Sequence, residues 1–130
     1  MEPLPGSRRR ARSRRTAAWA PSASALIAVC VQKQTKDGKD ITGAKYDAGL
    51  SASLMLVQAQ EIGLYTHHIG GIVRDEIHRI LGLDDNTEVV VLIAVGKIAA
   101  AEQLEGPAYE REIAPRVRLE LDEIMLYGRP

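Results

Sequence analysis

Two uninterrupted apolar runs stand out along the 130-residue chain, at residues 25–31 and at residues 89–95, the second inside a predicted strand over residues 88–95. Each is short, rich in β-branched side chains and bounded by charged or turn-forming residues, which is typical of a buried β-strand. The second run, which ends at Gly96, is the stronger of the two. Because an unbroken apolar strand leaves no polar face for water, we expect both faces of this strand to be covered.

Between the two strands, the pattern predicts a long helix over residues 48–62. Asp47 is placed to cap its first turn, and Gly63 is placed to end it in the left-handed conformation. Leu50, Leu54 and Val57 form one apolar stripe. Further apolar residues cover much of the remaining surface: Ala52, Met55, Leu56, Ala59 and Ile62. A helix apolar nearly all round is buried on more than one side, so it is either central in the domain or shared with a partner subunit.

The remaining pattern is less regular. A second helix is expected over residues 74–81, with Ile77, Ile80 and Leu81 on its apolar side and Gly82 after its end. Residues 32–45 are expected to be a loop, and residues 97–109 a loop that could include a helical turn. Residues 116–121 alternate between charged and apolar side chains, as in a half-exposed strand or extended segment. Residues 122–127 suit a short helix. Together these elements predict an α+β fold.

Charge divides the chain into a basic tail, residues 1–22, and a domain over residues 23–130. Six of the 17 basic residues lie between Arg8 and Arg15, and the chain beyond residue 16 keeps 11 basic and 16 of the 17 acidic residues, a formal charge of 11 − 16 = −5. An export signal and a patch for anionic surfaces are alternative interpretations of the tail, but a disordered tail suits its composition best. The acidic body and the scarcity of aromatic residues argue against a nucleic-acid partner.

Few residues offer chemistry of their own. The single cysteine, Cys30, lies inside an apolar run and is expected to be a buried structural thiol. His67 and His68 are adjacent, so in an extended segment they point to opposite faces, and no metal site is expected. No apolar run reaches the roughly 20 residues that span a bilayer. We therefore expect no membrane partner and a cytoplasmic protein.

Gly70 and Gly71 are the best candidates for a binding site. Paired glycines let a ligand approach the backbone closely and let the amides donate to it, although Gly-Gly also marks ordinary turns. The order of motifs around this pair, over about residues 23–126, resembles the C-terminal half of the FMN-dependent nitroreductase family. The motifs are Tyr46-Asp47-Ala48-Gly49, Gly63-Leu64-Tyr65-Thr66, Ile69-Gly70-Gly71, Leu81-Gly82-Leu83, the strand that ends at Gly96, and Arg116-Val117-Arg118.

The resemblance implies a nitroreductase-like sheet flanked by helices around a long central helix, in a homodimer with FMN at the subunit interface. Gly70 and Gly71 would lie by the isoalloxazine ring, and Arg116 and Arg118 would contact the flavin phosphate. Without the resemblance, the two arginines read as a solvated strand face. The arginine run of residues 10–15 looks like the family's N-terminal phosphate motif, but the predicted strand follows it too soon, and we treat the likeness as chance.

Two functions follow. One is an FMN-dependent NAD(P)H oxidoreductase that transfers hydride through bound flavin to a small electron acceptor. The other is a truncated, non-catalytic remnant that serves as a dimerisation module without cofactor. Because the family's N-terminal flavin-binding segment has no counterpart in this interpretation, we expect FMN binding to be weak.

Overall fold

The computed structural model describes residues 20–125, which fall into two units, one ending at Ile98 and the other beginning at Ala99. Most of the predicted basic tail lies outside the described residues. Its last three residues, Ala20–Ser22, form a short 3-10 helix, η1, and Ala20 is buried in the core. The folded part of the chain therefore includes these three residues, although the composition of the chain predicts them to be part of the tail.

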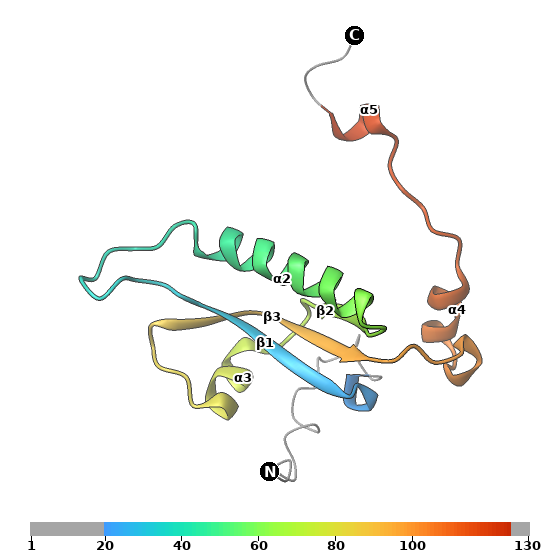
Figure 1. The fold of residues 1–130 in the computed structure, drawn as a ribbon, viewed down its shortest axis with the longest axis horizontal. Helices are drawn as coiled ribbons and strands as arrows, with labels where there is room; N and C mark the ends of the chain where they lie inside the picture. The colour runs from blue at the N-terminus through green and yellow to red at the C-terminus, as the bar shows by residue number, and fades with distance from the viewer. Residues whose placement is uncertain (1–19, 126–130) are drawn as a thin grey trace. The chain divides into compact units, whose positions relative to one another are not determined.

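A three-stranded antiparallel sheet forms the centre of the first unit, in the order β1-β3-β2 (Figure 1). Strand β1 spans Ala25–Gln32 and β3 spans Thr87–Gly96, each within one residue of prediction. Strand β2, Tyr65–Ile69, was expected only as an extended segment. Three consecutive residues of β3, Leu92 to Ala94, are buried, so this strand is covered on both faces as predicted.

One face of the sheet carries the main core. Helix α3, Arg74–Leu81, places Ile77 against this face, and η1 adds Ala20. Alternate strand residues point the same way because side chains in a strand have a period of two. The buried members of this core are Ala20, Ile69, Ile77, Val89, Leu92 and Ala94. Helix α3 has the predicted bounds, but only Ile77 of its three apolar residues is buried, since Ile80 and Leu81 line an open apolar hollow beside β1.

Helix α2, Ala44–Glu61, lies along the sheet and contacts β1 and β2 (Figure 1). Its buried residues are Ala52 and Ala59, which are two turns apart and so share one side of the helix. Small side chains on this side let the helix axis lie close to the strands. The predicted apolar stripe points the other way: Leu50, Leu54 and Val57 are 51%, 72% and 69% exposed.

The C-terminus of α2 ends as predicted, but its N-terminus does not begin as predicted. Gly63 has a φ of 74°, Gly63 N donates to Gln60 O, and Leu64 N donates to Ala59 O, which is a Schellman C-terminus of the predicted kind. The predicted cap at Asp47 is wrong. The helix begins at Ala44 after Gly43, so Asp47 lies inside its first turn, where its carboxylate still faces the positive end of the helix dipole.

The second unit is built from short pieces. A 3-10 helix η2, Ala101–Gln103, is followed by α4, Pro107–Ile113, and α5, Leu121–Ile124. The half-exposed strand considered for residues 116–121 does not form. These residues have no regular secondary structure up to α5, and Val117 and Leu119 are 80% and 66% exposed. A strand needs a neighbour for its backbone hydrogen bonds, and the described residues of this unit offer none.

An antiparallel sheet with helices packed on it confirms the predicted α+β fold, with α2 as the long helix on the sheet. Among the described residues, no helix is long and apolar enough to cross a membrane.

Candidate functional site

The Gly70-Gly71 turn lies directly after β2. Ile69, the last residue of β2, pairs with Leu92 of β3, and α3 begins at Arg74. Within the turn, Ile72 N donates to Gly70 O over 2.9 Å, so the backbone reverses tightly. Both glycines are exposed. The turn therefore presents uncovered backbone at the end of a strand whose other residues are tied into the sheet.

Glycine at position 70 is not required by the chain itself. Its φ is not positive, unlike that of Gly63 or Gly82, so another residue could adopt this backbone conformation. A Cβ built at Gly70 would meet no atom within 4 Å. An external group could approach the backbone closely through the open space beside Gly70.

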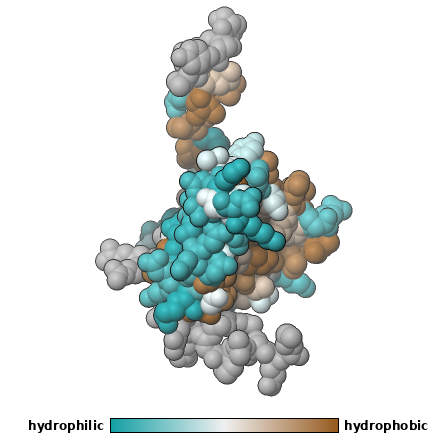
Figure 2. Space-filling view, turned by 90° about the vertical axis from the view of Figure 1, so that its left-hand side faces the viewer, coloured by the Kyte–Doolittle hydropathy of each residue, from teal (hydrophilic) through white to brown (hydrophobic). Residues whose placement is uncertain are grey.

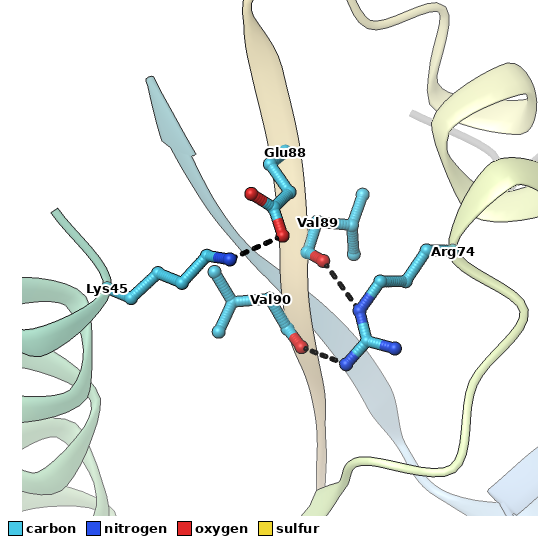
Figure 3. A network of polar contacts seen from close by, with 5 residues as sticks. All are labelled: Lys45, Arg74, Glu88, Val89 and Val90. Carbon is cyan, nitrogen blue, oxygen red and sulfur yellow. Dashed lines mark hydrogen bonds and ion pairs between the residues drawn. The ribbon is translucent and has the colours of Figure 1, made fainter. Parts of the chain in front are cut away.

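Arg74 ties the far end of the turn to β3 (Figure 3). Its Nε donates to Val89 O and its Nη2 donates to Val90 O, each over 3.2 Å. Val90 is the extra residue of a β-bulge, since Val29 pairs with Val91 and Cys30 pairs with Val89. Sequence reasoning missed this role, because nothing in the pattern shows where β2 stops pairing with β3 or where β3 bulges.

A second contact on β3 comes from α2. Lys45 Nζ lies 2.8 Å from Glu88 Oε1, and Figure 3 shows the two side chains meeting beside the same strand. The hydrogen bond from Lys45 is the main reason that the pKa of Glu88 lies below its ordinary value. Nearby positive charges on Arg74 and Lys33 act in the same direction. This pair joins the first turn of α2 to the start of β3.

Hydrophilic residues gather at the end of the first unit where the β1–α2 loop meets the turn before β3, the end that Figure 2 turns toward the viewer. Asn86 is central there: its Oδ1 accepts from Gln34 N and its Nδ2 donates to Gln32 Oε1. His78 Nε2 donates to Asp84 O over 2.8 Å. These contacts close loops, and none leaves a polar group buried without a partner among the described residues.

The predicted phosphate ligands belong to the second unit. Arg116 and Arg118 are exposed, and Nη1 of Arg118 donates to Val117 O over 2.9 Å. Gly70 and Gly71 belong to the first unit, so the two halves of the predicted site lie in different units.

The other sequence candidates are structural. His67 pairs with Ala94 and His68 with Ile93, so they alternate between the faces of the sheet, as expected for neighbours in a strand. No group of three or more potential metal ligands occurs within residues 20–125. Cys30 is half-buried, and burial raises the pKa of its thiol, as expected for a structural cysteine.

Residues 5–97 match the nitroreductase family, which is most of the chain, so the protein belongs to this family. The predicted resemblance is confirmed. The matched segment contains Gly70 and Gly71 and all three strands of the sheet. It also takes in the arginine run of residues 8–15, and it ends before Arg116 and Arg118.

Known proteins support the same assignment. An oxidoreductase containing FMN is 30% identical, with a TM-score of 0.76 over 85% of this chain and 58% of its own. A nitroreductase family protein from Clostridium difficile 630 is 24% identical, with a TM-score of 0.60 over 85% of this chain and 63% of its own, and so supports the fold. An uncharacterized 15.4 kDa protein from Mycolicibacterium smegmatis is 29% identical over 85% of this chain and 74% of its own. The chain thus spans less than two thirds of the length of the two solved structures.

Proposed function

We propose that the protein is an FMN-dependent NAD(P)H oxidoreductase that works as a homodimer. The observation that carries the proposal is the Gly70-Gly71 turn, because it combines exposed backbone with a glycine that neither backbone conformation nor crowding explains. We take FMN as the cofactor because the chain belongs to the nitroreductase family and is similar to an oxidoreductase containing FMN.

In this proposal, the turn borders the flavin ring. A side chain at Gly70 would fill the space through which a planar ring approaches the backbone, and the amides of the turn are available as donors to ring atoms. Bound FMN supplies the hydride-transfer chemistry, and the protein holds the ring and tunes it. The part of this chain is therefore to orient the cofactor and to keep water from one of its faces.

Arg116 and Arg118 hold the phosphate in the same proposal. Both guanidinium groups are exposed in the chain by itself, and two planar forks suit a phosphate dianion. Val117 lies between them in the sequence, and the carbonyl of Val117 already accepts from Arg118. Arg118 thus carries a hydrogen bond that orients its fork before any ligand arrives.

Dimerisation through α2 completes the proposal. Tyr46, Leu50, Leu54 and Val57 recur at helical spacing opposite the sheet-facing alanines, and all four are more than half exposed. A contiguous apolar ridge of this kind marks an interaction site. A second copy of the chain offers the same ridge, which is what a two-fold symmetric interface requires.

The test is an FMN titration followed by quenching of flavin fluorescence, with the Gly70→Ala variant beside the wild type. Gly49→Ala is the matched control, because Gly49 also has open space around it and no positive φ but lies in α2. We expect Gly70→Ala to keep the wild-type stability within about 0.5 kcal/mol and to lose about tenfold in FMN affinity, a loss of about 1.4 kcal/mol. Gly49→Ala should keep the affinity.

The phosphate ligands are tested in the same titration. Arg116→Ala and Arg118→Ala should each weaken binding at least tenfold, since a charge-assisted hydrogen bond contributes about 1.5–3 kcal/mol. Arg79→Ala, an exposed arginine on α3, is the control. Oxidation of NADH or NADPH by the FMN-loaded protein, with a nitroaromatic acceptor, then measures activity. If the wild-type protein binds no FMN at millimolar concentration, the enzyme hypothesis is rejected and the hypothesis of a dimerisation module without cofactor remains.

A further inference from the structure

The Gly70-Gly71 turn is anchored at both ends to one strand. At its start, Ile69 pairs with Leu92 of β3. At its end, Arg74 donates two hydrogen bonds to the carbonyl groups of Val89 and Val90 of the same strand. The chain therefore leaves the sheet after Ile69, opposite Leu92, and Arg74 ties it to β3 again at Val89 and Val90, as Figure 3 shows.

The second anchor contacts a part of β3 that lies beyond the end of β2. β2 ends opposite Leu92, so no residue of β2 pairs with Val89 or Val90. A buried backbone carbonyl group without a partner is costly, and Val89 is buried. The guanidinium group of Arg74 donates to both carbonyl groups in this stretch of β3, which lies beyond the end of β2.

The chemistry of the contact favours arginine over other cations. Two N–H groups in a rigid planar fork reach two adjacent carbonyl groups at 3.2 Å each. A lysine ammonium is a single point of positive charge and does not reproduce this fork. The position of Arg74 as the first residue of α3 also fixes where the helix begins after the turn.

We propose that Arg74 is a positioning residue that sets the backbone of the Gly70-Gly71 turn for the cofactor. This inference rests on the proposed function insofar as the turn contacts FMN. The fastening of the turn itself is independent of any ligand, so the two parts are tested separately.

The first experiment uses the protein without FMN and measures amide hydrogen exchange. The amide of Ile72, which donates to Gly70 O, reports whether the turn is closed. We expect Arg74→Met to speed exchange at Ile72 about tenfold, while the amides of the β1–β3 ladder keep their protection. Arg79→Met, which removes an exposed arginine from the same helix, should leave the exchange of Ile72 unchanged. Unchanged exchange at Ile72 in Arg74→Met would overturn the proposal.

The second experiment adds FMN and includes Arg74→Lys, which keeps the charge and loses the fork. If Arg74 positions the turn, both Arg74→Met and Arg74→Lys weaken FMN binding about tenfold and shift the visible absorbance spectrum of the bound flavin. If Arg74→Lys restores wild-type affinity and spectrum, charge alone explains the effect and the positioning role is rejected. A third outcome is faster exchange at Ile72 in Arg74→Met together with no FMN binding by the wild type. This outcome would support Arg74 as an anchor of the turn. It would reject both the proposed function and the role of Arg74 toward the cofactor.

Discussion

The ion pair between Lys45 and Glu88 joins α2 to the central strand across the surface of the first unit. Because the lysine lowers the pKa of Glu88, the folded protein holds this carboxylate in its charged form more strongly than the unfolded chain does. The resulting stabilisation is complete above the ordinary pKa of about 4.5 and is lost as the pH falls through the lowered folded value.

We therefore predict a pH-dependent effect for Lys45→Met. Urea unfolding at pH 7 should show the variant less stable than the wild type, and the difference should be smaller at pH 3, because the stabilisation is lost as the pH falls through the lowered folded pKa of Glu88. Lys36→Met, in the exposed β1–α2 loop, should match the wild type at both values. An equal difference at pH 7 and pH 3 would show that Lys45 acts through packing of its side chain instead.

Cys30 gives a second prediction at this scale. Burial raises the pKa of its thiol, so the thiolate that reacts with disulfide reagents is scarce in the folded protein. At pH 8, labelling by a chromogenic disulfide should be at least tenfold slower than in urea-unfolded protein. Because the folded pKa is raised, the stability gained by burying the neutral thiol is present below about pH 9 and is lost as the pH rises through the folded value. Rapid labelling of the folded protein would contradict this assignment.

Individual residues differed in how far sequence revealed their roles. Gly63 and Gly82 were predictable because a glycine after an apolar helical pattern is a local signal. Arg74 was not, since its partners are carbonyl groups that become available only where β2 ends and β3 bulges. The roles proposed for Gly70, Gly71, Arg116 and Arg118 came from the family resemblance and remain predictions.

At the scale of elements, the ends of helices were harder to predict than their existence. Asp47 carries a strong capping signal, yet the helix extends back to Ala44, where Lys45 gains its contact with Glu88. Strand β2 was missed because its polar residues, Thr66 to His68, show no apolar run, and its pairing with β3 supplies what the local pattern lacks. Tertiary contacts override weak local preferences in both places.

The contribution of the left-handed residue at the C-terminus of α2 to stability can be measured directly. Gly63 has a φ of 74°, which a residue with a Cβ adopts at a cost, so Gly63→Ala should lower the free energy of unfolding by about 1 kcal/mol. Gly49→Ala, inside the same helix, should be neutral or stabilising by up to about 1 kcal/mol. Thermal or urea unfolding of the two variants compares them, and equal stabilities would show that the helix ends without needing the left-handed residue.

At the scale of the whole molecule, apolar side chains outside the core need a partner. The outward ridge of α2 is one such surface, and the second unit has another, because none of residues 99–125 is buried while Val117, Leu119, Leu121 and Ile124 are more than half exposed. The apolar pattern of α2 left open whether the domain or a partner subunit covers the ridge, since apolar periodicity reports burial without naming what covers it.

The proposed dimer predicts that Leu54→Lys raises the dissociation constant at least tenfold, because each subunit loses one buried apolar side chain, about 1.5–3 kcal/mol, and gains a charge. Sedimentation at several concentrations measures it. Ser51→Lys is the matched control, since Ser51 is exposed on the same helix but away from the ridge. A wild-type protein that sediments as a folded monomer at micromolar concentration would contradict the dimer.

The order of strands in the sheet also has a consequence for how the chain folds. The central strand comes last of the three in sequence, and its pairing with β1 begins at Gln32 and Thr87, whose side chains meet across 55 residues. Closing so long a loop is slower than forming the nearer contacts between β2 and β3. During synthesis and refolding, β1 is therefore exposed as an unpaired, uncharged apolar segment that can associate with other chains. The yield of folded protein should consequently fall as the protein concentration during refolding rises.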